Sequence, residues 1–173
     1  CIEFTKIYRQ KEETFIELLN KVRNNALSPQ DIATLNQNYQ PNFIPSKDDN
    51  YITLTSHNAR ADKANQSKLA ELDSKPFTYT AEIEDDFPEY LYPNDVNLVL
   101  KVGAQVMFIK NDNVGRSYFN GKIGVVHSCS EDSVMVNCQG EMINVGQDFW
   151  ENTKYSISEG TSMVQQKVMG RYA

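Results

Sequence analysis

Apolar side chains recur every three or four positions in the first part of the chain. Phe15, Leu19 and Val22 share the spacing of one helix face and predict a helix over residues 11–24. The segment Ser-Pro-Gln-Asp at 28–31 is typical of a helix start, with serine as the N-cap and proline at the first helical position. We therefore expect a second helix of about ten residues from this point.

A strand and a third helix are expected next. The stretch 51–55 is rich in β-branched residues, which suit a pleated sheet, so it predicts a short strand. We expect Ser56 or Asn58 to cap a helix that ends near Leu72. The order helix, helix, strand, helix is typical of part of an α/β layer.

From residue 77 onward the period of the apolar positions changes to two. This pattern predicts strands at 77–83, 98–102, 104–110, 122–128, 132–138, 141–145, 153–157 and 162–169. Short strands joined by short turns are typical of a small antiparallel β-barrel. The sequence thus predicts an α+β fold, with a partial α/β layer over residues 1–75 and a mainly β part over residues 76–173.

Charge alters this picture once the chain is divided into segments. The 173 residues carry a net charge of −6. Residues 73–97 alone have seven acids and one lysine, whereas residues 98–128 have four basic residues against Asp112. The acidic total therefore conceals a basic segment, and a nucleic-acid partner stays possible.

Several classes of function are excluded or disfavoured by what the sequence lacks. No apolar run is long enough to cross a membrane, and no phosphate-binding loop of the Gly-x-x-x-x-Gly-Lys-Ser/Thr type occurs. The three cysteines lack the spacing of a zinc site and are expected to be small apolar residues, with a Cys129–Cys138 bridge as the alternative. The acidic stretch 82–89 lacks the spacing of a calcium loop, so a solvated face is expected rather than a metal site.

Two segments in the first half could contact phosphate groups. Arg9 precedes the first helix, and its guanidinium could pair with anionic oxygens, although for an arginine taken alone a surface salt bridge is the favoured explanation. Thr55, Ser56 and Asn58 precede or open the third helix, where free backbone N–H groups favour an anion. Ordinary helix capping is the alternative there.

The loop 111–122 combines cations with aromatic rings. Arg116 and Lys122 suit a nucleic-acid backbone, and Tyr118 and Phe119 offer rings on which bases can stack. The alternative is a plain hairpin connection in which Phe119 packs inward and Asn120-Gly121 forms the turn.

Taken together, these segments resemble the second RecA-like domain of superfamily 1 DNA helicases of the RecD/PIF type. Residues 7–10 resemble the motif around an arginine that contacts the γ-phosphate of ATP, and residues 54–65 resemble a strand-turn-helix that touches the DNA backbone. Residues 100–111 with 120–126 resemble the Src-homology-3-like barrel inserted in that domain. Helicases of this type are ATP-dependent motors that move 5′-to-3′ on DNA.

The resemblance implies roles for individual residues. Arg9 would be catalytic, and the DNA contacts would come from Thr55, Ser56, Asn58, Arg116, Tyr118, Phe119 and Lys122. The partners would be single-stranded DNA or a DNA fork and the first RecA-like domain of the same parent chain, with no membrane. ATP and Mg would serve the cytoplasmic parent enzyme, whereas the fragment is expected to bind neither and to be inactive alone.

The chain opens at Cys1 without a methionine, and we expect it to be a piece of a larger protein. Two other functions compete with the helicase fragment. One is a non-catalytic β-barrel module that binds protein or nucleic acid, and the other is a hydrolase with a site that the sequence does not reveal. No acid–base constellation favours the hydrolase.

Overall fold

The computed structural model describes residues 10–46, 51–157 and 164–173. The chain divides into two compact units, residues 1–46 and residues 47–173, which are described separately below. The predicted division at residue 75 stays a prediction.

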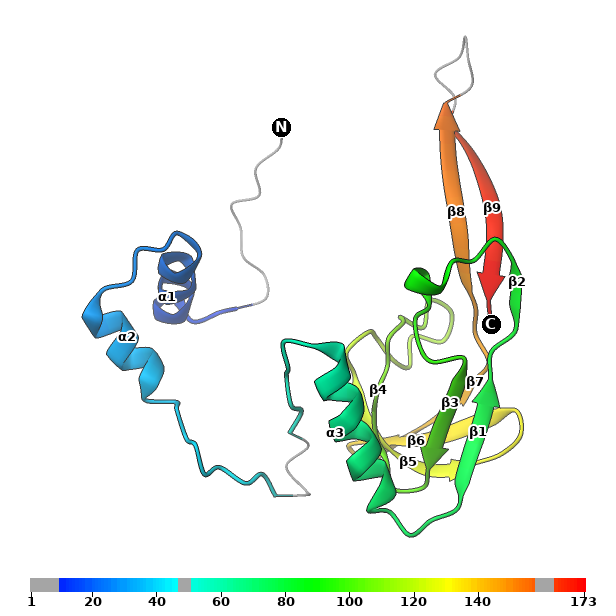
Figure 1. Ribbon diagram of the computed structural model, residues 1–173, viewed down its shortest axis with the longest axis horizontal. Helices are drawn as coiled ribbons and strands as arrows, with labels where there is room; N and C mark the ends of the chain where they lie inside the picture. The colour runs from blue at the N-terminus through cyan, green and yellow to red at the C-terminus, as the bar shows by residue number, and fades with distance from the viewer. Residues whose placement is uncertain (1–9, 47–50, 158–163) are drawn as a thin grey trace. The chain divides into compact units, whose positions relative to one another are not determined.

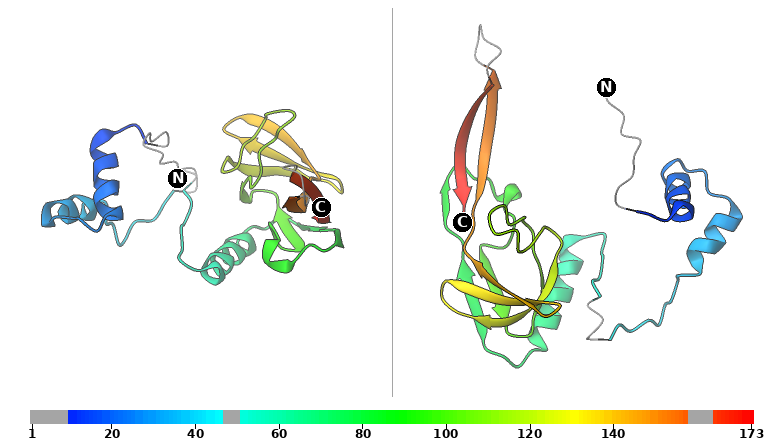
Figure 2. Two further views of the ribbon diagram at one scale, coloured as in Figure 1. Left: turned by 90° about the horizontal axis from the view of Figure 1, so that it is seen from above. Right: turned by 180° about the vertical axis from the view of Figure 1, so that it is seen from behind.

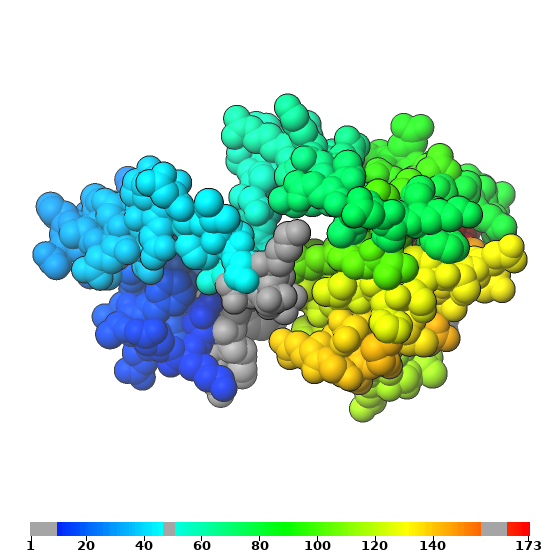
Figure 3. All heavy atoms as spheres, turned by 90° about the horizontal axis from the view of Figure 1, so that it is seen from below, coloured from blue at the N-terminus to red at the C-terminus, as the bar shows by residue number. Residues whose placement is uncertain are grey.

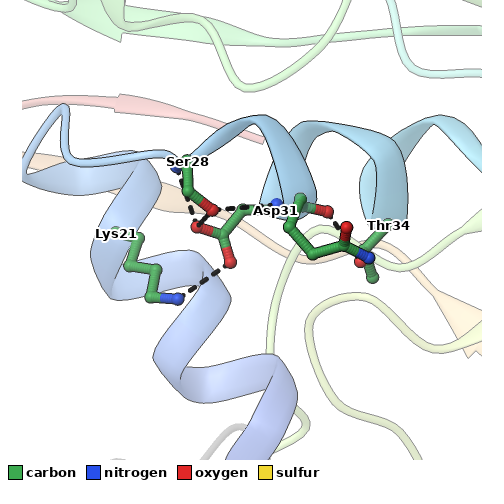
Figure 4. Close-up of polar contacts among 5 residues, drawn as sticks. Lys21, Ser28, Asp31 and Thr34 are labelled. Carbon is green, nitrogen blue, oxygen red and sulfur yellow. Dashed lines mark hydrogen bonds and ion pairs between the residues drawn. The ribbon is translucent and has the colours of Figure 1, made fainter.

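The first unit contains helices α1 (Glu13–Arg23) and α2 (Pro29–Asn36). As expected, Ser28 is the N-cap of α2, and its hydroxyl accepts from the Asp31 backbone N–H while the Asp31 carboxylate accepts from Ser28 (Figure 4). The same carboxylate pairs with the ammonium of Lys21 at 2.8 Å, which joins the two helices. These contacts, with the Lys21 hydrogen bond first, lower the pKa of Asp31 to about 2.

The second unit begins with an extended segment and helix α3 (Asn58–Ala70). The prediction of a strand at 51–55 was wrong: these residues belong to no strand, and the Leu54 side chain is 87% exposed. A strand needs a neighbour for its backbone N–H and C=O groups. Among the described residues, no strand pairs with this segment.

The end of α3 is fastened to the β-structure that follows. The ammonium of Lys101 donates to the Leu72 carbonyl at 2.7 Å, and the Ser74 hydroxyl donates to the Val102 carbonyl at 2.7 Å. Gly103 also lies against Leu72, so the helix end meets the strand end closely.

The strands form three antiparallel sheets, which Figures 1 and 2 show from three sides. The described strands do not close into one hydrogen-bonded barrel. They form three separate sheets, and β4 is only three residues long. The α+β class is confirmed, and most expected strands lie within a few residues of their predicted positions. The sheets are β1 (Pro76–Thr80) with β3 (Asn97–Lys101); β4 (Gln105–Met107), β5 (Ile123–Cys129), β6 (Ser133–Cys138) and β7 (Glu141–Gly146); and β2 (Ile83–Asp85), β9 (Val164–Tyr172) and β8 (Trp150–Ile157).

The core of the four-stranded sheet is a row of cross-strand partners. Val126 pairs with Val136, and Val136 pairs with Ile143, so three buried aliphatic side chains lie side by side across β5, β6 and β7. Phe108 and Cys138 form a buried hydrophobic cluster with Val136 and Ile143 of this row. The space-filling view shows these yellow strands packed closely against the green residues of β1 and β3 (Figure 3). The Tyr79 hydroxyl of β1 reinforces this contact by donating to the Ser130 carbonyl at 2.8 Å.

The β8–β9 ribbon extends away from the four-stranded sheet (Figures 1 and 2). Its base is held by aromatic contacts, in which Tyr172 lies 5.0 Å from Tyr92 and 6.4 Å from Trp150 between ring centroids. Lys110, just beyond β4, donates to the Asp148 carboxylate at 2.7 Å and to the Phe149 carbonyl at 2.6 Å. Among the described residues, these contacts with the rest of the β-structure lie at the base of the ribbon.

Candidate nucleic-acid interface

The loop between β4 and β5, residues 108–122, is organised around one carboxylate. Asp112 accepts backbone N–H bonds from Gly115 at 2.8 Å, Val114 at 3.0 Å and Ser117 at 3.1 Å. These bonds, with that from Ser117 the largest contribution, hold the pKa of Asp112 below its ordinary value. A carboxylate that accepts several backbone donors fixes the turn around it.

The base of the loop is closed by backbone bonds. The Phe108 N–H donates to the Lys122 carbonyl at 2.9 Å, and the Gly121 N–H donates to the Phe108 carbonyl at 2.7 Å. The expected turn at Asn120-Gly121 is present, with Gly121 at a φ of 97°, a conformation that glycine adopts at low cost. The side chain of Asn111 accepts from the Asn120 N–H at 2.8 Å and crosses the loop.

The exposed side chains of the loop include a cation, an aromatic ring and an aliphatic group. Arg116 is exposed, and its backbone φ of 55° lies in the left-handed region. Phe119 is 60% exposed, so the alternative in which it packs inward was wrong. Val114 is 96% exposed and was missed by the sequence analysis, because a lone valine in a polar loop carries no signal of its own.

Two other predicted side chains already have partners within the protein. The Tyr118 ring is stacked on Phe108 with 4.3 Å between centroids, and burial raises the pKa of its hydroxyl. The ammonium of Lys122 pairs with the Glu141 carboxylate at 2.7 Å and donates to the Ser117 carbonyl at 2.8 Å. Arg116 and Phe119 are therefore the more accessible members of the predicted loop set.

The second predicted contact lies at the start of α3. The N-cap is His57, rather than Ser56 or Asn58, and it makes no side-chain capping bond. The Thr55 hydroxyl donates to the His57 carbonyl at 2.9 Å, and the Ser56 hydroxyl lies 2.8 Å from the His57 Nδ1 atom. Helix capping by a side chain, the alternative explanation, is thus not what the structure shows, and the residues at the start of the helix are exposed.

The predicted residues fall into separate groups. Arg116, Tyr118, Phe119 and Lys122 share one loop, and Thr55, Ser56 and Asn58 share the start of α3. No hydrogen bond or ion pair of the described residues joins the two groups. Arg9 lies outside the described residues. Among those described, no three His, Cys, Asp or Glu side chains cluster closely enough to hold a metal ion.

The chain is similar to curated proteins named ATP-dependent DNA helicase PIF1. It is 35% identical to the protein of Homo sapiens over 132 residues, which cover 72% of this chain and 20% of the human protein. It is 29% identical to the Pif1 of Bdellovibrio bacteriovorus over 133 residues, which cover 74% of this chain and 29% of that protein. The chain thus spans about a fifth of the human relative's length. No protein-family model matches it.

Solved structures of Pif1 from a Bacteroides species share the fold. The crystal structure in complex with ADP-AlF4 gives a TM-score of 0.81 at 31% identity and covers 96% of this chain and 38% of that chain. The crystal structure bound to ssDNA gives a TM-score of 0.64 at 31% identity and covers 99% of this chain and 39% of that chain. Within the described ranges, no helix of this chain has the length and apolar character that a membrane span requires.

Proposed function

We propose that this chain, which is homologous to the PIF1 superfamily 1 DNA helicases, is a fragment of an ATP-dependent DNA helicase and supplies single-stranded DNA contacts within it. The support is twofold. The relatives carry the name ATP-dependent DNA helicase, and a solved relative of the same fold is bound to ssDNA. Movement in the 5′-to-3′ direction and a cytoplasmic location belong to the same proposal.

The observation that carries the DNA contact is the exposed part of the loop 108–122. A guanidinium at Arg116 and a ring at Phe119 stand in solvent on a loop whose backbone is fixed by Asp112. Single-stranded nucleic acid is bound by cations along the backbone and by rings that stack on bases. A fixed loop loses little conformational freedom on binding, which favours affinity.

The start of α3 is proposed as a second contact, with one DNA phosphate. The first backbone N–H groups of a helix and the positive end of its dipole favour an anion. Thr55 and Ser56 place hydroxyl groups at this end, and Asn58 begins the helix.

Arg9 is proposed to stabilise charge on the transferred phosphoryl group of ATP. Such arginines act by electrostatic stabilisation in phosphoryl transfer. ATP, Mg and the first RecA-like domain are then expected in the parent protein, and the fragment alone is expected to lack ATPase and unwinding activity. In this proposal the described residues contribute DNA contacts rather than a metal site.

The loop contact is tested with the chain itself and fluorescently labelled single-stranded DNA. Anisotropy at low and moderate salt should show binding that weakens as salt rises, because phosphate contacts release counterions. Arg116→Glu should weaken binding severalfold and reduce the salt dependence. In the double variant Arg116→Glu, Lys122→Glu, the new carboxylate at position 122 repels Glu141, and binding should weaken further.

Lys75→Glu provides the matched control. It makes the same charge change at an exposed lysine before β1, within the acidic segment, and should leave affinity nearly unchanged. Equal loss in both variants would mean that only net charge matters and would refute the assignment of the loop. Absence of DNA binding together with capture of a protein partner would favour the non-catalytic module instead.

A further inference from the structure

A hollow of about 660 Å³ opens at one end of the four-stranded sheet. Its walls come from two segments, the loop end and start of β5 at residues 119–125 and the β6–β7 turn at residues 137–140. Only the first of these segments contains residues of the predicted DNA contact, Phe119 and Lys122. The second adds side chains to which nothing described so far gives a role.

The topology of the sheet explains why the two segments meet. In the antiparallel order β4-β5-β6-β7, alternate connections lie at the same end, so the β4–β5 loop and the β6–β7 turn are neighbours. The ion pair between Lys122 and Glu141, at 2.7 Å, spans the two connections directly. The hollow therefore lies where these two connections of the sheet meet.

Two glycines, Gly121 and Gly140, line the hollow and present backbone without a side chain. Gly121 and Gly140 both have positive φ, 97° and 95°, and a Cβ added at either would meet nothing within 4 Å. Gln139, at a φ of 56°, forms a two-residue hairpin turn with Gly140 and is exposed. A flat ligand can therefore approach the wall without meeting a side chain at these positions.

The chemistry of the walls combines a ring with amides. Phe119, 60% exposed, forms one wall. Asn137 uses its Oδ1 atom to accept from the Gly140 N–H at 2.8 Å, which orients the side-chain nitrogen, and that nitrogen has no partner among the described residues. The Gln139 amide adds both a donor and an acceptor beside it.

We propose that this hollow is a nucleobase subsite for a single-stranded DNA, an inference that rests on the DNA contact proposed above. One base stacks on Phe119, and its polar edge meets the amides of Asn137 and Gln139. The adjoining phosphate lies toward Arg116, on the same loop. The subsite thus joins a base contact to the backbone contact.

Charge decides between a base and a phosphate as the occupant. Lys122 is the one charged residue among those lining the hollow, and its ammonium is already neutralised by Glu141. A phosphate would require an unpaired cation, whereas an uncharged base requires a ring face and neutral donors and acceptors. The lining matches the base.

The test compares an ordinary labelled oligonucleotide with one of equal length in which abasic sites replace the bases. Base stacking is worth about 1–3 kcal/mol, which corresponds to a factor of about 5–150 in affinity. We expect Phe119→Ala to weaken binding of the ordinary strand by about this factor and to leave the abasic strand unaffected. Gln139→Asn, which tolerates the positive φ, should change the order of affinities for dA, dC and dT strands.

Tyr90→Ala is the matched control, because it removes an aromatic side chain that is 84% exposed on the 3₁₀ helix Glu89–Leu91. It should leave both strands unaffected. If the chain binds both strands equally and Arg116→Glu weakens both, the DNA contact stands and the base subsite is refuted. If the chain binds neither strand, the DNA contact and the subsite fail together. Circular dichroism should confirm that each variant is folded.

Discussion

Asp112 shows how one residue can determine the conformation of a whole loop. Its carboxylate holds three backbone N–H groups within 3.1 Å, although the surrounding segment is basic. The lowered pKa means that the folded loop favours the ionised form. This contribution is present above the ordinary aspartate pKa and is lost as the pH falls through the lowered value.

Replacement of Asp112 by alanine should release the loop. The amide protons of Gly115 and Ser117 should exchange faster, and single-stranded DNA should bind more weakly even though a negative charge has been removed near the site. Hydrogen exchange at neutral pH and anisotropy measure the two effects. In the unmodified protein, the same amides should stay protected down to pH 5 and lose protection only in stronger acid.

Asp132→Ala, at an exposed carboxylate beside β6, makes the same charge change away from the loop. It should leave both measurements unchanged or strengthen DNA binding slightly. Stronger DNA binding by Asp112→Ala than by the unmodified chain would contradict the proposed role, since charge would then outweigh loop order.

Sequence reasoning identified the residues of the loop better than their environments. The composition indicated Arg116 and Phe119, and both are exposed. It could not show that Lys122 contacts Glu141. These residues are nineteen positions apart in the chain, and only the pairing of the strands brings them together. Asn137 and Gln139 were not predicted at all, since their placement follows from the sheet order.

At the scale of the element, Gly124 shows how closely two strands can pack. A Cβ added at this position in β5 would lie 2.5 Å from the Val136 Cγ1 atom and 2.6 Å from the Cys138 Sγ atom. The strand therefore needs glycine for lack of space rather than for backbone conformation. The four-stranded sheet depends on this contact, because Val136 lies in its buried row.

Gly124→Ala should destabilise the chain by about 1–3 kcal/mol, the usual cost of an overpacked core. Urea denaturation followed by circular dichroism measures the change. Gly146→Ala at the end of β7, where an added Cβ meets nothing within 4 Å, should change the free energy of unfolding little. Equal stability of the two variants would show that the core relaxes around the extra methyl group.

Local sequence patterns predicted the helices and strands well where the residues of the pattern themselves make the stabilising contacts. Ser28 and Pro29 began α2 as expected, and alternating apolar positions located the strands of the four-stranded sheet. The segment 51–55 has the composition of a strand but forms none here, because composition cannot supply a pairing partner. The cap of α3 also differed, since side-chain type alone does not fix which residue leaves the helical conformation.

For the whole molecule, the basic segment is less available than its charge suggests. Lys101, Lys110 and Lys122 all donate to groups of the protein. The net positive charge over residues 98–128 is therefore used largely to hold the fold together, and Arg116 is the remaining basic side chain of that segment. This is why the predicted DNA contact is concentrated at one guanidinium.

The proposed role of Arg9 is tested in a longer protein that contains this sequence together with the proposed ATP site. Arg9→Ala should reduce DNA-stimulated ATP turnover by about 10³–10⁵, the range known for arginines that stabilise the transferred phosphoryl group. Phosphate release measures it. Arg23→Ala, at an exposed arginine of α1, is the control and should retain activity. Undiminished turnover in Arg9→Ala would refute the assignment.

The bonds of Lys110 have a mechanical consequence. One ammonium group ties the start of the loop 108–122 to the Asp148 carboxylate and the Phe149 carbonyl, directly before β8. The β8–β9 ribbon extends away from the four-stranded sheet (Figure 1), and this ammonium group binds residues at its base. We therefore expect a shift at the base of the ribbon to reach the loop that carries Arg116 and Phe119 through this one ammonium group.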